Sequence, residues 1–218
     1  APTYAGACRL EAEVGRRMLE RLDYVKLAPR RVLDAGSGPP QRLLGRRYPK
    51  AEVIALDFSL GMLRAGKKRW IERNAPKAVC ADLERLPLAA GAVELVWSNM
   101  ALHWVREPEA ALREFARVLA AEGLVMFSTL GPDTLKELRT AAGPARVHAF
   151  IDMHDLGDML VAAGFSAPVM DMEMLTLRYE HPAQLLQDLR ASGQTNVRLD
   201  RRRGLSAKSF RTRVLAGA

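Results

Sequence analysis

Cysteine, aromatic residues and long apolar runs are all scarce in this chain of 218 residues. Two cysteines, Cys8 and Cys80, argue against a disulfide framework and make a reducing cytoplasm the expected compartment. The longest apolar runs, such as Leu83–Val93, fall well short of the roughly 20 residues of a membrane-spanning helix. The first ten residues have no basic start followed by an apolar stretch, so we expect no signal peptide. With 49% hydrophobic and 27% charged residues, the composition is typical of a globular, soluble protein.

Most of the net charge of +8 lies near the end of the chain. The segment from Arg198 to Arg213 holds seven basic residues and one acidic residue, Asp200. A solvated helix face is one interpretation of such a run, and an acidic partner is the other. Phe210 is the one aromatic residue in the segment, so bases would find little to stack on. We therefore favour an acidic protein partner and expect neither nucleic acid nor a membrane.

Apolar runs and helical patterns alternate along the chain. The runs are continuous, as is typical of parallel strands covered on both faces, and are Arg31–Ala35, Val53–Leu56, Ala78–Ala81, Val93–Trp97 and Gly123–Thr129. The alternation predicts an α/β fold with an open, doubly wound, Rossmann-like, mostly parallel sheet. Since no repeat or linker interrupts it, we expect a single domain over residues 1–218.

Spacing and capping signals predict the helices. A first helix has Leu10, Val14, Met18 and Leu22 on one face, and Ser59 caps another that runs through Met62 and Leu63 toward Trp70. A third has Pro108 in its first turn, Gly123 as its stop, and an apolar face of Leu112, Phe115, Ala116 and Leu119. A fourth, with Leu156, Met159, Leu160 and Ala163, closes at Gly164. Beyond it, Pro168–Tyr179 reads as one long strand and Pro182–Ala191 as a helix with Leu185, Leu186 and Leu189 inward.

Polar residues stand where four of the predicted strands end, and ligands bind at that edge of such sheets. They are Asp34 with Gly36 and Gly38, then Asp57, Asp82 and Asn99. A carboxylate such as Asp57 accepts both hydroxyls of a ribose, and Asp82 accepts a hydrogen bond from an exocyclic amine such as that of adenine. Taken singly, a glycine turn without a ligand or an aspartate that caps a helix remains an alternative for each.

The glycine turn argues against a dinucleotide. A dinucleotide site has a third glycine and a helix amino end whose N–H groups face the pyrophosphate. This chain continues from Gly38 into Pro39 and Pro40, and proline has no N–H to donate. A nucleoside without phosphates fits the turn better.

Four stretches resemble the successive motifs of class I S-adenosylmethionine-dependent methyltransferases. They are Val32-Leu-Asp-Ala-Gly-Ser-Gly38, Ala55-Leu-Asp57-Phe-Ser59, Cys80-Ala-Asp82-Leu83 and Trp97-Ser-Asn-Met-Ala-Leu-His-Trp104. The resemblance implies S-adenosylmethionine as the cofactor and the following cofactor-binding residues: Asp34, Gly36, Gly38, Asp57, Phe58, Met62, Asp82, Leu83 and Asn99. Within this set it implies that the glycines pass the methionine part, that Asp57 holds the ribose, and that Met62 packs on the base. The chain departs from the family pattern in having Pro40 where a third glycine is usual and few residues, Pro39–Ala51, for the first helix.

The flanking segments are similar to the malonyl-acyl-carrier-protein O-methyltransferases of biotin synthesis. They are Glu13–Leu22, Phe127–Arg139 and Phe150–Asp158. This family methylates the free carboxylate of a malonyl thioester on an acidic carrier protein, and malonyl-coenzyme A is the other candidate substrate. The resemblance implies a helical lid in residues 1–30, a cofactor-binding core in 31–129 and a substrate side in 130–218. The family has a longer lead-in and a further strand after the basic segment, so we expect trimmed ends.

Two alternatives remain open. Residues 155–196 are also similar to a mitochondrial assembly factor of the respiratory NADH dehydrogenase, a protein-arginine hydroxylase on the same fold. The chain also fits a protein that binds the cofactor without transferring a methyl group. Iron or another electron source would be needed for a hydroxylase, and the four histidines show no convincing ligand spacing.

A carboxylate that accepts a methyl group needs no general base, because its pKa near roughly 4 leaves it ionised at neutral pH. It does need a cation or donor to place it and an apolar wall to exclude water. The substrate-positioning candidates are Tyr4, Asn99, His103, Trp104, Arg139, Arg146 and His148. Arg139 or Arg146 would clamp the carboxylate and His148 would donate to the thioester carbonyl, whereas an exposed arginine or a surface histidine is the plain alternative. Lys67–Arg69 and Arg198–Arg213 are the candidate carrier-docking segments, and the sequence leaves the oligomeric state open.

Overall fold

The computed structural model describes residues 4–40, 42–66 and 75–194. These residues divide into two compact units. The first contains residues 9–129 and 154–169, and the second contains residues 4–8, 130–153 and 170–194. We describe each unit by itself.

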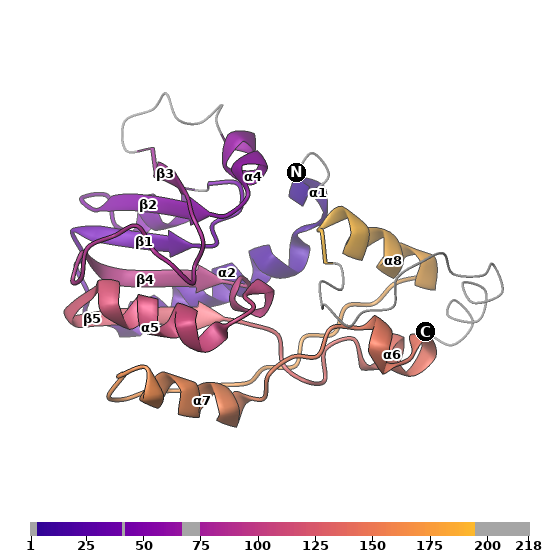
Figure 1. The fold of residues 1–218 in the computed structure, drawn as a ribbon. Helices are drawn as coiled ribbons and strands as arrows, with labels where there is room; N and C mark the ends of the chain where they lie inside the picture. Colours follow the sequence, from indigo (N-terminus) through magenta and orange to yellow (C-terminus); the bar gives the residue numbers. More distant parts are fainter. Residues whose placement is uncertain (1–3, 41, 67–74, 195–218) are drawn as a thin grey trace. The chain divides into compact units, whose positions relative to one another are not determined.

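The first unit is built on a five-stranded parallel sheet with the strand order β3-β2-β1-β4-β5 (Figure 1). Its strands are β1 (Arg31–Ala35), β2 (Glu52–Asp57), β3 (Lys77–Cys80), β4 (Val93–Asn99) and β5 (Leu119–Ser128). From β1 the chain adds β2 and β3 on one side of the sheet and then β4 and β5 on the other, so the strand order reverses between β1 and β4. Ligands bind in such folds at this switch point, beside the carboxyl ends of β1 and β4. The predicted doubly wound, parallel sheet is confirmed.

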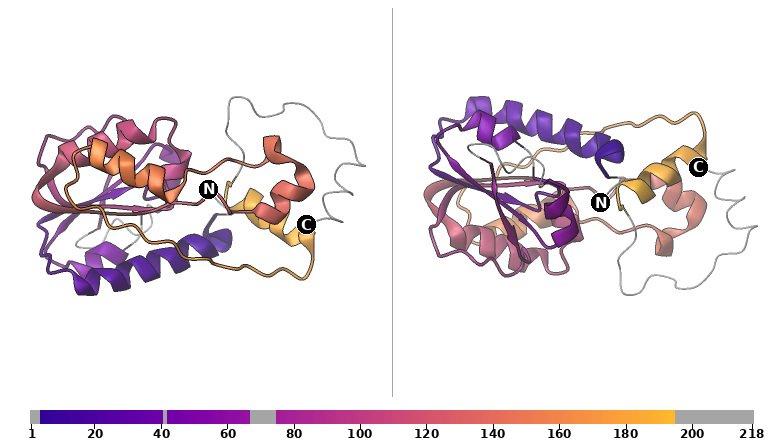
Figure 2. Two further views of the ribbon diagram at one scale, coloured as in Figure 1. Left: turned by 90° about the horizontal axis from the view of Figure 1, so that it is seen from below. Right: turned by 90° about the horizontal axis from the view of Figure 1, so that it is seen from above.

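Helices cover both faces of this sheet, as Figure 2 shows for α2 on one face and for α5 and α7 on the other. The helices of the first unit are α2 (Arg9–Arg21), η1 (Leu22–Tyr24), α3 (Leu43–Arg47), α4 (Leu60–Ala65), η3 (Leu102–Trp104), α5 (Pro108–Val118) and α7 (Met153–Ala162). Ser59 caps α4 as predicted, because its side chain accepts a hydrogen bond from the Met62 N–H at 3.4 Å. The predicted continuation toward Trp70 lies outside the described residues. Gly164, with φ of +101°, follows the end of α7 as expected.

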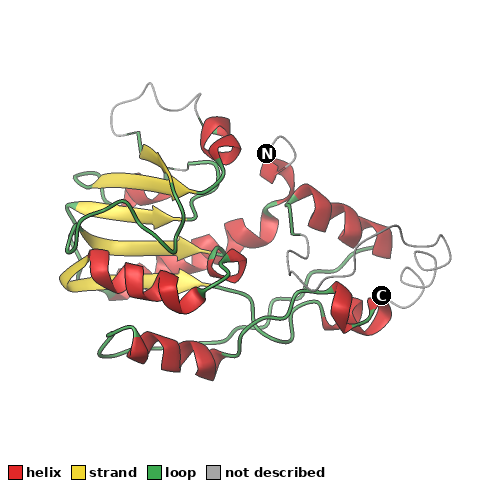
Figure 3. Cartoon of the chain, in the orientation of Figure 1, coloured by secondary structure: helices red, strands yellow, loops and turns green. Residues whose placement is uncertain are grey.

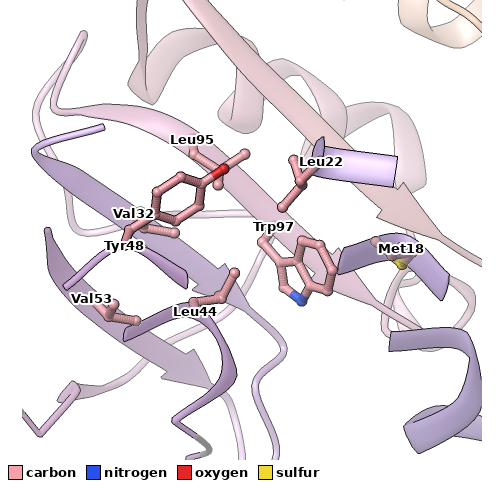
Figure 4. Close-up of a cluster of buried hydrophobic side chains, with 8 residues drawn as sticks. All are labelled: Met18, Leu22, Val32, Leu44, Tyr48, Val53, Leu95 and Trp97. Carbon is pink, nitrogen blue, oxygen red and sulfur yellow. The ribbon is translucent and has the colours of Figure 1, made fainter. Parts of the chain in front are cut away.

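The apolar faces of the helices pack into the core. One cluster joins α2 and η1 to the sheet and consists of Met18, Leu22, Val32, Leu44, Tyr48, Val53, Leu95 and Trp97 (Figure 4). On α5, Leu112 and Phe115 have no exposed surface at all. Burial of such side chains stabilises the fold by about 1.5–3 kcal/mol each, so the sheet and its helices form a rigid platform.

Two predicted boundaries are wrong. Helix α5 ends at Val118, and Leu119 already pairs with Val93 as the first residue of β5, so Leu119 is not part of the helical face. Gly123 lies within β5 and does not stop the helix. A Cβ atom at Gly123 would lie 2.7 Å from Leu119 Cγ, so the glycine is required by a tight irregularity of the strand.

The predicted strand over Pro168–Tyr179 is also wrong, because these residues form neither helix nor strand (Figure 3). Val169, Met172 and Met174 are largely exposed there. A strand needs a hydrogen-bonded neighbour, and none pairs with this segment among the residues that the structure describes.

The second unit is helical, with α1 (Tyr4–Ala7), α6 (Lys136–Ala142), η4 (Pro144–Arg146) and α8 (Pro182–Ala191). The predicted helix over Pro182–Ala191 is confirmed. Leu186 and Leu189 of α8 pack against Leu138 and Val147, which form the centre of a small separate core. In the described ranges of both units, no helix is long and apolar enough to cross a membrane.

Candidate functional site at the carboxyl ends of the strands

The glycine turn after β1 is held by backbone hydrogen bonds. Gly36 N–H and the next N–H, that of Ser37, both donate to the carbonyl of Leu56 on β2, at 2.8 and 2.9 Å. Gly36 has a φ of +76°, and a Cβ atom there would lie 2.3 Å from the Cβ of Ala101. Ser98, which is fully buried at the end of β4, donates its hydroxyl to the Ala35 carbonyl at 2.9 Å. The turn is therefore fixed from both neighbouring strands, and Gly36 admits no side chain.

Asp57 joins this turn to the end of β2. One carboxylate oxygen accepts the Gly38 N–H at 2.9 Å, and the other accepts the Ser59 N–H at 2.8 Å. Burial raises the pKa of Asp57, and the two backbone N–H groups oppose that rise. Each oxygen keeps a second lone pair, so a fixed carboxylate remains able to accept hydroxyl donors.

Asp34 lies beside Asp57 on the neighbouring strand β1. Burial raises the pKa of Asp34 to about 7, and the negative charge of Asp57 adds to the rise. Among the residues that the structure describes, no cationic side chain lowers the pKa of either carboxyl. Such a pair of acids favours a positively charged ligand at this edge and disfavours phosphates.

The loop after β3 contributes Asp82 and Leu83. Asp82 is exposed, and its carboxylate accepts the Glu84 N–H at 3.0 Å. Leu83 is buried, and its Cδ1 atom lies 3.9 Å from the position of a Cβ at Gly36. Phe58, directly after Asp57, has 78% of its surface exposed, and Met62 is half-buried at the start of α4. These residues follow the ends of the neighbouring strands β2 and β3, where Asp57 pairs with Cys80.

Asn99 has a structural partner at each end of its amide. Its Nδ2 donates to the Glu11 carbonyl of α2 at 2.8 Å, and its Oδ1 accepts the Ser128 hydroxyl of β5 at 2.9 Å. Ser128 in turn accepts the N–H of Met100, a residue with φ of +55°. The side chain predicted to contact a ligand therefore fastens α2 to the ends of β4 and β5. Its role as a ligand contact stays a prediction.

Two more predicted residues lie on η3, directly after this point. His103 and Trp104 are half-buried, and their ring centroids are 5.2 Å apart. Together they place a polar heteroaromatic ring and a large apolar ring close to the end of β4.

The other four predicted residues, Tyr4, Arg139, Arg146 and His148, belong to the second unit, so the structure describes them apart from the residues above. The guanidinium of Arg139 donates to the carbonyls of Pro132 and Thr134 at 2.8 and 3.1 Å. These bonds fix the loop before α6, a role that the sequence did not indicate. His148 contacts the ring of Phe150 edge-on, with centroids 5.1 Å apart.

Sequence reasoning missed two groups of residues. Ser98 and Ser128 lie within stretches that carry the family resemblance, but the sequence assigns neither of them a role; the available signal is that each ends an apolar run. Glu84, Glu114 and Arg117 fix the loop after β3 from outside the motifs. In the described part of the chain, no group of three histidine, cysteine or acidic side chains is arranged to hold a metal ion. Cys8 and Cys80 are not joined by a disulfide.

Three features of this edge match the chemistry of S-adenosylmethionine. That molecule carries a ribose, an adenine base and a positive sulfonium, and the edge offers the fixed carboxylate of Asp57, the acidic group of Asp34 and the exposed ring of Phe58. Pro39 and Pro40 remove two N–H groups from the turn, so it is poorly suited to a polyphosphate.

Comparison with known proteins gives a matching family model and curated relatives. Residues 33–127 match a family model described as a methyltransferase domain. Two curated malonyl-acyl-carrier-protein O-methyltransferases, from Laribacter hongkongensis and a Methylovorus species, are 49% and 50% identical to this chain. Each alignment covers 99% of this chain and 77% of the relative.

Solved structures agree on the fold. The YcgJ protein of Bacillus subtilis has a TM-score of 0.57 at 21% identity, with 68% of each chain covered. The plantazolicin methyltransferase BpumL, solved in complex with SAH, has a TM-score of 0.57 at 14% identity, with 75% of this chain and 68% of that chain covered. At such low identity the likeness establishes the class of fold alone.

Proposed function

Because the chain belongs to the family of malonyl-acyl-carrier-protein O-methyltransferases, we propose that it methylates the free carboxylate of a malonyl thioester on an acyl-carrier protein. The observation that carries the proposal is the identity of 49–50% over 99% of the chain. The same identity supports a transferase over the hydroxylase-type assembly factor. S-adenosylmethionine is the cofactor that the family implies, and biotin synthesis is the pathway that the family name implies.

Asp57, with the turn that it holds, is the proposed anchor of the cofactor. Its two oxygens would accept the ribose hydroxyls, and Asp82 with Leu83 would frame the adenine beside Phe58 and Met62. Gly36 and Gly38 would pass the methionine part, and Asp34 would face its positive charge. When bound, S-adenosylmethionine supplies a methyl group that its sulfonium makes electrophilic.

The residues of this chain need to orient the malonyl carboxylate and keep water away. A carboxylate has a pKa near roughly 4 and is ionised at neutral pH, so no side chain has to remove a proton from it. His103 and Trp104 are the proposed wall beside the carboxylate in the first unit. Arg139, Arg146, His148 and Tyr4 are the proposed substrate contacts of the second unit. Of these, Arg139 already donates to two carbonyls and keeps further N–H groups for a carboxylate.

The proposed partner is an acidic acyl-carrier protein. The net charge of +8 supports electrostatic attraction to it, because opposite charges speed the encounter of two proteins. The two candidate docking segments, Lys67–Arg69 and Arg198–Arg213, lie outside the described residues. Malonyl-coenzyme A is the competing substrate, because it carries the same free malonyl carboxylate.

Incubation of the purified protein with S-adenosylmethionine and malonyl-carrier protein tests the proposal. Mass spectrometry should show one added methyl group on the malonyl carboxylate. A parallel reaction with malonyl-coenzyme A ranks the two thioesters, and a carrier protein bearing an acetyl group, which has no free carboxylate, is the matched control. Absence of the methyl ester with both malonyl thioesters would contradict the proposal.

A further inference from the structure

Residues 82–88, which run from the end of β3 toward β4, carry two of the proposed adenine contacts, Asp82 and Leu83. Leu83 and Leu86 of this loop are buried, whereas Asp82, Arg85 and Pro87 are exposed. Hydrogen bonds to α5 and to its amino end fix the backbone between the buried side chains.

Arg117 of α5 binds the far end of this loop. Its Nη1 donates to the Leu88 carbonyl at 2.8 Å, and its Nη2 donates to the Leu86 carbonyl at 3.0 Å. Two further bonds, of 2.6 and 2.7 Å, join the same guanidinium to the Glu114 carboxylate. Glu114 also accepts the Leu86 N–H at 2.7 Å. One bidentate ion pair thus holds three backbone groups of the loop.

Glu84 binds the near end of the loop to the start of α5. A single oxygen of its carboxylate accepts the N–H groups of Arg106 and Glu107, at 3.0 and 3.1 Å. Glu107 precedes the first turn of α5 and has no side-chain cap of its own. Asp82 closes the turn before Glu84, because its carboxylate accepts the Glu84 N–H and its carbonyl accepts the Arg85 N–H.

The hydrogen bonds serve the loop more than the helix. Ala111, Leu112, Phe115 and Val118 of α5 have no exposed surface, so packing already fixes that helix on the sheet. The side chains of Arg117 and Glu114, by contrast, keep 37% and 20% of their surface exposed and lie at the rim. Their bonds fix the loop backbone at Leu86 and Leu88, and Glu84 fixes its other end. Leu83, next to Glu84, lies against the Gly36 turn, with its Cδ1 atom 3.9 Å from the position of a Cβ there.

We propose that Glu114 and Arg117 are positioning residues for the cofactor: they hold residues 82–88 in the conformation that receives the adenine. The inference rests on the proposed function, since it assigns S-adenosylmethionine to this edge. A loop that is fixed before binding loses little conformational freedom when the ligand arrives. Without the ion pair, binding would have to order the loop, and affinity would fall while the reacting groups stay in place.

Arg117→Gln tests the inference, with Arg113→Gln as the matched control on the same helix. The side chain of Arg113 is 62% exposed and pairs with Glu109 in a solvated i,i+4 contact. We expect Arg117→Gln to raise the dissociation constant of S-adenosylmethionine about tenfold, because charge-assisted bonds to the loop are lost. The KM for the cofactor should rise to the same extent, and kcat at saturating cofactor should stay within about twofold. Arg117→Lys, which keeps one charged donor, should fall between the two.

Trypsin cleavage between Arg85 and Leu86 gives a second readout that does not depend on activity. A loop released from α5 opens more often, so this bond should be cut faster in Arg117→Gln than in the wild type or in Arg113→Gln. Thermal melting of each variant separates loop opening from global unfolding, because the cleavage assay is run well below the melting temperature. Added S-adenosylmethionine should slow the cleavage.

The outcomes separate the two proposals. A wild-type protein that binds no S-adenosylmethionine would overturn the proposed function, and the inference with it. Wild-type binding together with equal affinities in Arg117→Gln and Arg113→Gln would overturn the inference alone. A fall in kcat without a change in affinity would also overturn it, because the ion pair would then act on the reaction and not on the cofactor.

Discussion

Gly36 is constrained at the level of the single residue by both its backbone and its surroundings. Its φ of +76° favours glycine, and a Cβ would lie 2.3 Å from the Cβ of Ala101. Both constraints exclude a side chain, so the backbone of the turn stays exposed beside the carboxyl ends of the strands.

Gly36→Ala is therefore expected to lower the free energy of unfolding by about 2–4 kcal/mol, from backbone strain and overpacking together. Gly61→Ala is the control, because Gly61 lies in α4 and its added Cβ would meet Ser59 Oγ only at 3.8 Å. That change should stabilise the protein by about 0.4–1 kcal/mol. Urea unfolding measures both, and equal effects of the two substitutions would refute the explanation.

Asp34 makes stability depend on pH. Its pKa is raised from 3.8 to about 7 in the folded protein, so the folded state retains a proton that the unfolded state has released. Stability is then fully present below about pH 4 for this group and is lost as the pH rises toward 7. Asp34→Asn removes the titration, so the variant should gain stability relative to the wild type between pH 5 and pH 8, by an amount that urea unfolding at several pH values measures. A difference that does not change with pH would argue against the assignment.

At this scale the sequence predicts where a polar residue stands more readily than what its side chain contacts. A carboxylate after a buried strand is visible in the sequence, so Asp57 was predicted at its observed position. Asn99 was predicted on the same ground, yet its amide is used by Glu11 and Ser128. Partners 88 and 29 residues away in the chain leave no local pattern.

At the scale of elements, α2 is held on the sheet by apolar packing and by one polar bridge. Met18 of α2 lies in the main core, while Asn99 reaches from β4 to the first turns of the helix. Gly15 permits this approach, because a Cβ there would lie 3.0 Å from Asn99 Nδ2.

Asn99→Ala should lower the free energy of unfolding by about 1–3 kcal/mol, because it leaves the Glu11 carbonyl and the Ser128 hydroxyl without this partner. Ser128→Ala should cost less, and the double variant should cost less than the sum of the two, because both substitutions remove the same bond. Urea unfolding followed by circular dichroism provides the cycle. Strict additivity would show that the bridge does not act as a unit.

The boundaries of elements show what periodicity can and cannot predict. β1 was predicted at both of its ends, since Arg31 and the glycine turn mark them. The spacing of Leu119 is compatible both with the apolar face of α5 and with the start of a strand. Its pairing with Val93 places it in β5. Pro168–Tyr179 has the composition of a strand, but composition does not supply a neighbour.

At the scale of the whole molecule, the net charge and the family both support the proposed acidic partner. A net charge of +8 attracts an anionic carrier protein. Salt limits the range of this attraction, because the screening length falls from about 10 Å at 0.1 M to about 3 Å at 1 M. Attraction of this kind acts on the encounter between enzyme and carrier and little on the chemical step.

Replacing Arg201, Arg202 and Arg203 together with glutamate should lower kcat/KM for malonyl-carrier protein, roughly tenfold or more at low salt and much less at high salt. The same triple variant should bind S-adenosylmethionine as the wild type does. Steady-state rates at two ionic strengths, with calorimetry for the cofactor, check both expectations. An effect that salt does not change would exclude electrostatic docking by this segment.

Titration of the protein with S-adenosylmethionine in a calorimeter tests the central claim most directly, with Asp57→Asn beside the wild type and Asp23→Asn as an exposed control. We predict binding to the wild type and to Asp23→Asn alike. In Asp57→Asn it should be weaker by roughly ten- to a hundredfold, since the amide cannot replace a charged acceptor of the ribose hydroxyls. No heat of binding in the wild type, or equal affinity in Asp57→Asn, would contradict the account.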